Sequence, residues 1–322
     1  MGYVNTALGV NVTFLRHLSP IGNIGFISQS GALGSVMDDI FAARPTLGFS
    51  YFVSLGNKTV IDESDVLEYL AQDSHTKVIG MYLENVRDGE RFRKMLAAYA
   101  HKKPIIILKS GTTDIGSKAA MSHTGGMVGN DQVFDALLKQ YGVIRAENFE
   151  EFFTLCKLYS CGRIPQSNKI CIISNAGGAG VLLTDEMYKN SFELTPLSDQ
   201  GKENVKKSLA RWKQMNIHNP IDLLGDATSI EYKTILKIIH EENSVGCILA
   251  LLTPQANTDV ETIAECLKEA QGENTKPIFP VFMGEKSVYK SWKIFEEGGM
   301  MDFASYDHVA QVLRKVRWRE DY

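Results

Sequence analysis

The residue in this sequence best suited to group-transfer chemistry is His123, in the motif SHTGG. A neutral imidazole is available near pH 7 and can act as a nucleophile towards a phosphoryl group. The motif lies in the stretch Lys109 to Gly129, KSGTTDIGSKAAMSHTGGMVG, which is rich in glycines and hydroxyls and has no strong periodicity. Such a stretch inside a compact domain is usually functional or disordered. We expect a mobile loop that presents His123, and the stretch alone leaves open a surface histidine in a flexible linker.

Two turns of similar sequence could bind an anion. Ile24 to Asp39 reads IGFISQSGALGSVMDD, and Ile170 to Asp185, at an offset of 146 residues (170 − 24), reads ICIISNAGGAGVLLTD. Each segment runs from a strand through a glycine turn into a helix, whose start offers unpaired amides and partial positive charge to phosphate or carboxylate. Glycines that serve packing only are the alternative for either turn alone. Neither turn matches a Walker A motif or a full dinucleotide-binding GxGxxG.

This repeat also predicts the fold. KPIIILKSG (103–111) corresponds to KPIFPVFMG (276–284), and each is preceded by a strand and a helix. The strands are continuous apolar runs, which are typical of a parallel sheet covered on both faces. The sequence therefore predicts an α/β protein with two tandem doubly wound, flavodoxin-like parallel-sheet domains, 1–162 and 163–322, with the boundary at CGRIP.

The first half has the clearest element patterns. The segment before Asn23 is turn-rich and is expected to be an entry strand or a linker. The expected strands are 23–28, 49–55, 77–83 and 104–109. The expected helices are 63–72, 89–101, one that begins at 131, and 149–159.

The composition limits the class of protein. Hydrophobic content of 44% and charged content of 22% describe a globular protein, and a net charge of −4 gives no electrostatic attraction for nucleic acid or an acidic membrane surface. No apolar run approaches the roughly 18 residues of a membrane span. The five cysteines lack zinc-type spacing and fit buried thiols in a reducing compartment. We therefore expect a cytoplasmic protein that binds no metal through this chain.

A family resemblance rests on motifs spread over essentially the whole chain. In order, these are SQSGALG, SLGNKTVIDESDVLEYL, YLENVRDG, KSGTTDIGSKAAMSHTGG, SNAGGAGV, NPIDLLGDA and LLTPQANTD. With them the sequence resembles the ADP-forming acyl-CoA synthetases of the succinyl-CoA synthetase superfamily. The resemblance implies a ligase that interconverts acyl-CoA, ADP and phosphate with free acid, CoA and ATP. It also implies an acyl phosphate and then a phosphohistidine on a swinging loop.

The same resemblance implies roles for particular residues. His123 would be the phosphohistidine and Glu84 the carboxylate that orients its ring, although spacing alone favours a solvated glutamate at the end of a strand. Two helix starts, one from each domain, would together hold the phosphorylated histidine. The residues implied to bind phosphate are Ser30 and Gly31 in the first domain and Asn175, Gly177 and Gly178 in the second. The loop residues beside the histidine are Ser122, Thr124 and Gly125.

The resemblance further implies missing parts and partners. Relatives carry a CoA-binding domain and an ATP-grasp subunit or domain, which would supply most of the sites for CoA and for ATP or ADP with magnesium. The chain begins near the junction with the first of these, so we expect an incomplete enzyme that assembles into an oligomer and uses phosphate and a small carboxylic acid. Two alternatives stay open: a non-catalytic module that senses acyl-CoA or an acid, and a related carbamoyl or acyl transferase.

Overall fold

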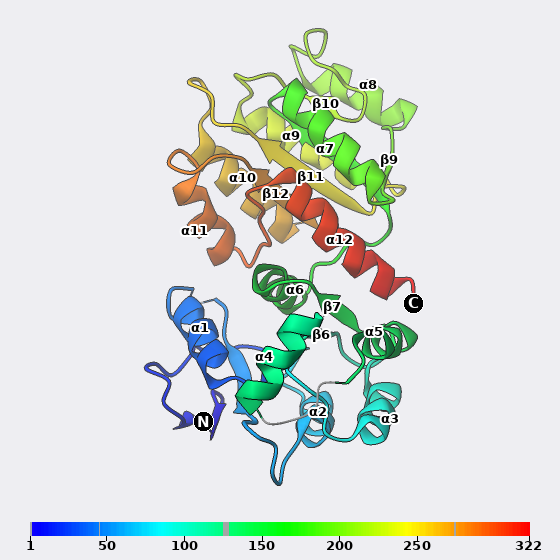
Figure 1. The fold of residues 1–322 in the computed structure, drawn as a ribbon. Coiled ribbons are helices and arrows are strands. Elements are labelled where there is room, and N and C mark those ends of the chain that lie inside the picture. Colours follow the sequence, from blue (N-terminus) through cyan, green and yellow to red (C-terminus); the bar gives the residue numbers. More distant parts are fainter. Residues whose placement is uncertain (1, 45, 125–128, 274) are drawn as a thin grey trace. The chain divides into compact units, whose positions relative to one another are not determined.

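The computed structural model describes residues 2–44, 46–124, 129–273 and 275–322, and the chain divides into two compact units. Unit 1 is Met1–Gly162 with Tyr322, and unit 2 is Arg163–Asp321. Each unit has its own sheet with helices packed against it (Figure 1).

Unit 1 is built on a seven-stranded sheet with the order β2-β1-β4-β3-β5-β6-β7. The strands from β4 to β7 in this order run parallel to one another, whereas β1 is antiparallel to both β2 and β4. The N-terminal segment, expected to be one entry strand or a linker, thus forms an antiparallel pair at the edge of the sheet. The strands are β1 (Gly2–Asn5), β2 (Val10–Val12), β3 (Ile24–Ser28), β4 (Phe49–Ser54), β5 (Val78–Leu83), β6 (Ile105–Lys109) and β7 (Ile144–Ala146).

The helices of unit 1 cover both faces of its sheet. On one face, α1 and α6 contribute aromatic rings that pack on the strands, with 4.7 Å between the ring centroids of Phe41 and Phe49 and 5.6 Å between those of Phe152 and Phe26. On the other face, α2, α3 and α5 share a buried cluster with β5 and β6. The helices are α1 (Gly31–Ala42), α2 (Glu63–Gln72), α3 (Gly89–Tyr99), α4 (Asp114–Thr124), α5 (Asp131–Gln140) and α6 (Phe149–Cys161).

Unit 2 has a smaller, wholly parallel sheet with the order β10-β8-β11-β12, and β9 pairs with β8. Every residue of β11 and of β12 is buried, and so is every residue of β8 after Lys169. The strands are β8 (Lys169–Ser174), β9 (Glu193–Leu194), β10 (Ile221–Asp222), β11 (Cys247–Leu252) and β12 (Ile278–Phe282). The helices are α7 (Gly177–Lys189), α8 (Asp199–Ser208), α9 (Ser229–His240), α10 (Val260–Glu273), α11 (Tyr289–Glu297) and α12 (Tyr306–Glu320).

The two units repeat one topology, which confirms the predicted pair of doubly wound domains. Four central strands have the same order in each, β4-β3-β5-β6 and β10-β8-β11-β12. The helix after the glycine turn begins at Gly31 in unit 1 and at Gly177 in unit 2, and 177 − 31 = 146 is the offset of the sequence repeat. Even a local bond is repeated, because the first residue after β4 and the first after β10 each donate a backbone hydrogen bond of 2.8 Å to the serine that ends the central strand.

One expectation about unit 1 is wrong. The stretch from Lys109 to Gly129 was expected to be a loop, but residues 114–124 form α4. The helix begins after Thr113, whose hydroxyl accepts a hydrogen bond of 3.0 Å from the Gly116 amide, as an N-cap does. Lysine, alanine and methionine in the segment SKAAM are strong helix formers and outweigh one internal glycine.

Candidate functional site

The first glycine turn places a helix start directly after β3. Ser28 Oγ donates to the carbonyl oxygen of Ser30 at 2.6 Å and accepts from the Ser30 amide at 3.2 Å, which fixes the turn. Ser30 is the N-cap of α1, and its hydroxyl accepts from the amide of Leu33 at 3.4 Å. Gly31 opens the helix and is partly exposed. The turn therefore presents a helix N-terminus to solvent, as an anion site requires.

The second glycine turn repeats this geometry in unit 2. Ser174 Oγ donates to the carbonyl oxygen of Ala176 and accepts from its amide, both at 2.9 Å. Helix α7 then begins with Gly177 and Gly178, which are exposed, and its N-cap Ala176 makes no side-chain cap. A Cβ on Gly177 would lie 2.8 Å from Asp222 Oδ2, so a larger residue there requires the Asp222 carboxylate to move.

The side chain of Asn175 bonds within unit 2. It is 1% exposed, and its side chain bonds to the backbone that follows β11: Oδ1 accepts from the Thr253 amide at 2.9 Å and Nδ2 donates to the Thr253 carbonyl at 2.8 Å. Its side chain therefore braces the end of β11. The predicted contact of Asn175 with phosphate stays a prediction, and it would have to be made by the backbone of this residue.

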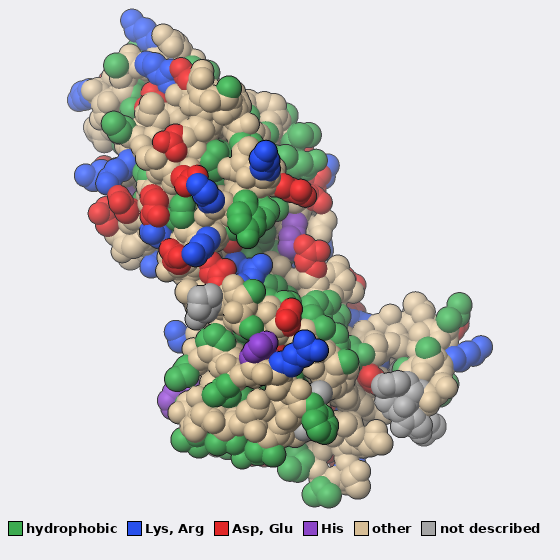
Figure 2. Space-filling view, turned by 90° about the vertical axis from the view of Figure 1, so that its left-hand side faces the viewer, with side chains coloured by type: hydrophobic (Ala, Val, Ile, Leu, Met, Phe, Trp, Pro, Cys, Tyr) green, Lys and Arg blue, Asp and Glu red, His purple; other side chains and the backbone are tan. Residues whose placement is uncertain are grey.

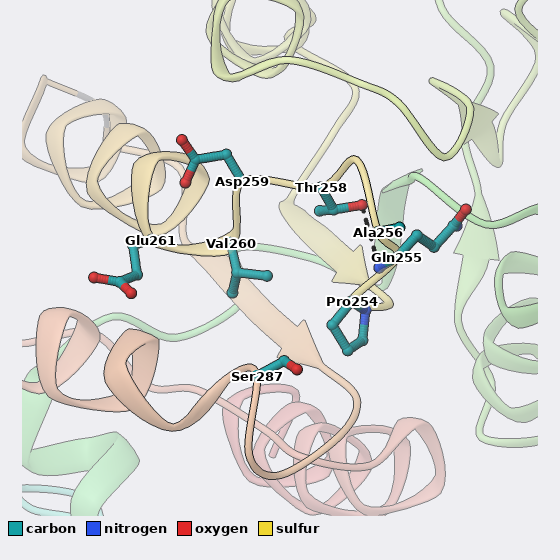
Figure 3. A pocket seen from close by; sticks show the side chains of 8 residues that line it. All are labelled: Pro254, Gln255, Ala256, Thr258, Asp259, Val260, Glu261 and Ser287. Atoms are coloured by element: carbon teal, nitrogen blue, oxygen red, sulfur yellow. Dashed lines mark hydrogen bonds between the residues drawn. The ribbon is translucent and has the colours of Figure 1, made fainter.

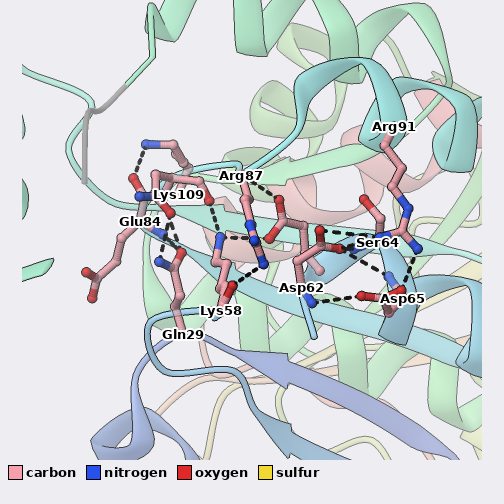
Figure 4. Close-up of polar contacts among 11 residues, drawn as sticks. Gln29, Lys58, Asp62, Ser64, Asp65, Glu84, Arg87, Arg91 and Lys109 are labelled. Carbon is pink, nitrogen blue, oxygen red and sulfur yellow. Dashed lines mark hydrogen bonds and ion pairs between the residues drawn. The ribbon is translucent and has the colours of Figure 1, made fainter. Parts of the chain in front are cut away.

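Glu84 follows β5 and is buried, with 5% of its surface exposed. The alternative of a solvated glutamate at the end of a strand is therefore wrong. Its backbone is held by Gln29, the residue of the first turn that corresponds to Asn175 in the repeat. Gln29 Oε1 accepts from the amides of Glu84 at 2.7 Å and Asn85 at 3.1 Å, and its Nε2 donates to Asn85 Oδ1 at 2.9 Å (Figure 4).

Two buried lysines bond to the same segment. Lys109 Nζ donates to the Glu84 carbonyl at 2.9 Å, and Lys58 Nζ donates to the Asn85 carbonyl at 2.6 Å (Figure 4). Burial lowers the pKa of both ammonium groups. Lys58 also pairs with Glu63 at 2.8 Å, and the two side chains are 3% and 0% exposed. The ammonium groups of Lys58 and Lys109 thus both lie next to the backbone that follows β5.

His123 lies near the end of α4. Its side chain and that of Thr124 are outside the described part of the structure, as is Gly125, so the expected pairing of His123 with Glu84 stays a prediction. Ser122, also expected beside the site, is exposed on the same helix. What the structure does place together, in unit 1, is the first glycine turn and the end of β5, joined through Gln29.

Sequence reasoning missed Gln29, Lys58 and Lys109. Gln29 could have been found, because it aligns with Asn175 in the repeat and both side chains carry an amide. Lys109 ends an apolar strand and Lys58 lies in the motif SLGNK, but only strand order brings them to Glu84. The buried environment of these lysines follows from long-range contacts that spacing does not reveal.

Other features of the surface are less specific. A pocket of about 380 Å³ lies beyond β11 in unit 2, and it is lined by Pro254, Gln255, Ala256, Thr258, Asp259, Val260, Glu261 and Ser287 (Figure 3). Acidic and basic side chains are intermixed on the face seen in Figure 2. Among the described residues, no three histidine, cysteine or carboxylate side chains are grouped to hold a metal ion. No helix in the described ranges has both the length and the apolar character needed to cross a membrane.

Comparison with known proteins gives a consistent result. Residues 21–159 match the family model of the succinyl-CoA ligase like flavodoxin domain. The chain is 36% identical over 97% of its length to acetate–CoA ligase [ADP-forming] I of Archaeoglobus fulgidus, and spans 44% of that protein. It is 32% identical over 96% of its length to the alpha subunit of acetate–CoA ligase [ADP-forming] II of Pyrococcus furiosus, and spans 68% of that subunit.

A solved structure matches both units. It is the acetyl-coenzyme A synthetase 1 of Ca. Korarchaeum cryptofilum, described as dinucleotide forming and in complex with phosphate and ADP. The TM-score is 0.91 at 28% identity, and the match covers 99% of this chain and 69% of that one. The chain thus corresponds to less than half of the first of these relatives and to about two thirds of the other two.

Proposed function

Since the chain belongs to the family of ADP-forming acetate–CoA ligases, within the succinyl-CoA synthetase superfamily, we propose that it is the part of such an enzyme that accepts and passes on the phosphoryl group. The phosphorylated residue is His123. The observation that carries the proposal is the buried Glu84, held rigidly at the end of β5 and tied through Gln29 to the turn that opens α1. A carboxylate held in this way can orient an imidazole.

The proposed chemistry has two transfers at one histidine. The unprotonated ring nitrogen of His123 attacks the phosphorus of an acyl phosphate, so that a P–N bond forms while the P–O bond to the acyl group breaks and the free acid leaves. The other ring nitrogen keeps its proton and donates it in a hydrogen bond to Glu84, which stabilises the positive charge on the ring. A terminal phosphate oxygen of ADP then attacks the phosphorus, the P–N bond breaks, and ATP and neutral imidazole are released.

The two helix starts supply binding rather than bond-making groups. In unit 1 the start of α1, at Ser30 and Gly31, offers backbone amides and partial positive charge to a phosphate, and in unit 2 the start of α7, at Gly177 and Gly178, offers the same. Both helix starts are at least partly exposed, and a Cβ on Gly178 would meet no atom within 4 Å, so a phosphate has room there. Stabilising the dianionic phosphoryl group is a usual role of such preorganised donors.

The other substrates of the proposed reaction are CoA, the nucleotide and a carboxylic acid. CoA and ATP or ADP would bind on the CoA-binding and ATP-grasp parts that relatives of this kind possess, and magnesium would enter with the nucleotide. A small carboxylic acid such as acetate is the proposed substrate, by analogy with the relatives. The free thiols of the chain fit a reducing cytoplasm, where we place the enzyme.

The direct test is ATP formation from acetyl-CoA, ADP and phosphate by the complete enzyme. We expect His123→Ala to abolish turnover and Glu84→Gln to lower kcat by roughly 100-fold or more, because a misoriented imidazole loses its nucleophilic tautomer. His101→Ala, an exposed histidine of the same unit, is the matched control and should leave the rate unchanged. Full activity in His123→Ala would overturn the proposal and leave a non-catalytic acyl-CoA-sensing module as the better account.

A further inference from the structure

We propose that Lys109 and Lys58 are positioning residues that aim the Glu84 carboxylate by holding the backbone of Glu84 and Asn85. This inference rests on the proposed function, because it assigns a means of control to the carboxylate that orients His123. Both lysines lie in sequence motifs, Lys58 in SLGNK and Lys109 at the start of KSGTT, but neither motif indicated a role for them. Their role follows from where their ammonium groups bond.

The backbone at the end of β5 is bonded to side chains on both sides. The two amides of Glu84 and Asn85 share one acceptor, Gln29 Oε1. The two carbonyls each receive one ammonium, that of Lys109 for Glu84 and that of Lys58 for Asn85. Four backbone groups are thus fixed by three side chains from three separate elements, so the segment cannot rotate without breaking several hydrogen bonds.

Unit 2 shows that the fold alone does not require these lysines. Its equivalent strand end, Thr253, is held by the amide of Asn175. Strand register places Phe282 where unit 1 has Lys109, since Leu252 pairs with Phe282 as Leu83 pairs with Lys109. The buried lysines thus lie beside the strand that is followed by a glutamate, β5, and the equivalent strand of unit 2, β11, is followed by a threonine.

Register gives the same result for Lys58. Ser28 pairs with Ser54 and Ser174 pairs with Asp222, so the position four residues further on is Lys58 in unit 1 and Asp226 in unit 2. Asp226 bonds instead to Arg211 at the surface. Both lysines are therefore particular to the unit that carries Glu84 and His123.

The burial of the lysines argues against an incidental role. Lys58 is 3% exposed and Lys109 is 8% exposed, and an ammonium loses hydration when it is buried. Lys58 adopts φ 55°, a left-handed conformation that is uncommon outside glycine. Two buried lysines, one of them in a left-handed conformation, are costly features, and such features concentrate at functional sites. Their position beside Glu84 therefore supports a functional role for this strand end.

The link to the first phosphate-binding turn follows from Gln29. This residue stands directly before Ser30, the N-cap of α1, and its side chain bonds to the segment that the lysines hold. Removing the Lys109 hydrogen bond would free the Glu84 carbonyl while Gln29 still holds the amide and the Tyr82 hydroxyl still donates to Glu84 Oε1 at 3.4 Å, and the carboxylate would sample more orientations. A displacement of about 1 Å in a catalytic group can reduce a rate by roughly 100-fold.

The test compares two lysine variants in the complete enzyme. Lys109→Met keeps the length of the side chain and removes the donor. Lys103→Met is the matched control, because Lys103 also donates to two backbone carbonyls in unit 1, those of Leu70 and Asp73, but at the opposite end of the sheet. The readout is the single-turnover rate at which His123 becomes phosphorylated by ATP. We expect a fall of roughly 10- to 100-fold for Lys109→Met and less than about twofold for Lys103→Met.

A double variant separates positioning from a general loss of structure. If Lys109 acts through Glu84, then Lys109→Met combined with Glu84→Gln should be no slower than Glu84→Gln alone. Lys109→Arg should recover part of the rate, since it restores a donor. Equal phosphorylation rates for Lys109→Met and Lys103→Met, or additive losses in the double variant, would overturn the inference. The proposed function would still stand in that case, provided that the wild type becomes phosphorylated. Failure of the wild type to become phosphorylated would instead overturn the proposed function.

Discussion

At the scale of single residues, the structure shows that Glu84 is buried and that side chains from other parts of unit 1 hold its backbone. The internal repeat finds the glycine turns, the stretch from Lys109 to Gly129 draws attention to His123, and the family resemblance points to Glu84. None of these shows that Glu84 is buried, or that Lys58, Lys109 and Gln29 surround its backbone, since these residues are far apart in the sequence and meet only through the order of strands β4, β3, β5 and β6. Spacing in the sequence therefore does not reveal which side chains hold the backbone at Glu84.

The ion pair of Lys58 with Glu63 gives a prediction about stability. Lys58→Met leaves Glu63, which is fully buried, without its cation. We expect unit 1 to lose about 3 kcal/mol of unfolding free energy, because a buried charge whose partner is removed keeps its desolvation cost. Chemical denaturation followed by circular dichroism measures this. The double variant Lys58→Met with Glu63→Leu should be more stable than the single variant, and a single variant as stable as the wild type would show that the pair contributes nothing.

At the scale of elements, the sequence predicts most strands and helices of the first half, and it misses a few short strands and one helix. Helix α2 has the predicted bounds, and four strands lie within a residue or so of theirs. The missed elements are of two kinds. The strands β1, β2 and β7, which lie at the edges of the sheet or next to one, are only three or four residues long, so their patterns are weak. Helix α4 contains a glycine and several hydroxyls, which favour the expectation of a loop.

The paired glycines of the repeat give a prediction that the sequence alone would get wrong. Gly34 and Gly180 are identical in the alignment, and each lies in the first turn of its helix. A Cβ on Gly34 would lie 2.2 Å from Phe52 Cζ, whereas one on Gly180 would meet no atom closer than 3.7 Å. We expect Gly34→Ala to destabilise unit 1 by about 1–3 kcal/mol through overpacking. We expect Gly180→Ala to stabilise unit 2 by about 0.5–1 kcal/mol.

Thermal or denaturant unfolding of the two alanine variants checks this directly. Each variant is the control for the other, because the substitution and the position in the repeat are the same. Equal effects of the two substitutions would mean that Phe52 moves aside without cost.

The start of α2 gives a pH-dependent prediction. Asp65 accepts from the Asp62 amide at 2.9 Å and pairs with Arg91. The Arg91 hydrogen bond, followed by the Asp62 amide, holds the pKa of Asp65 below its usual value. Since the folded pKa is lower than the unfolded one, the stabilisation is complete above the unfolded pKa and is lost as the pH falls through the folded pKa.

Asp65→Ala should therefore destabilise unit 1 at pH 7 by about 1 kcal/mol, chiefly through the lost cap, because the half-exposed Arg91 is screened by solvent. The difference from the wild type should shrink as the pH falls below about 4. Unfolding curves at pH 7 and at low pH measure it. A difference that does not change with pH would mean that the ionised carboxylate contributes nothing.

At the scale of the whole molecule, the repeat of topology is the main result. The internal offset of 146 predicts two similar domains, and each unit has its own sheet and its own buried cluster. Strand order could not be read from the repeat, because adjacency in a sheet depends on crossover connections rather than on sequence order. The differences between the units, such as Lys109 against Phe282, support the proposal that the chemistry belongs to unit 1.

The division into units predicts independent folding. A fragment of residues 163–321 contains the whole sheet of unit 2 and the helices that cover it. We expect it to unfold in one cooperative transition, because a domain of this size can bury its own core. Calorimetry of the fragment, beside one of residues 1–162, measures this. Fragments without a cooperative transition would show that the two units depend on each other for stability.

The central claim is that His123 carries a phosphoryl group, and the intact mass of this chain tests it most directly. The chain is mixed with ATP, magnesium and the ATP-grasp part of the enzyme, with His123→Ala and the control His101→Ala alongside. We expect a gain of about 80 Da, for one HPO₃, that is lost in acid, is retained in the control and is absent in His123→Ala. No gain in mass, with an ATP-grasp part shown to bind both ATP and this chain, would contradict the account.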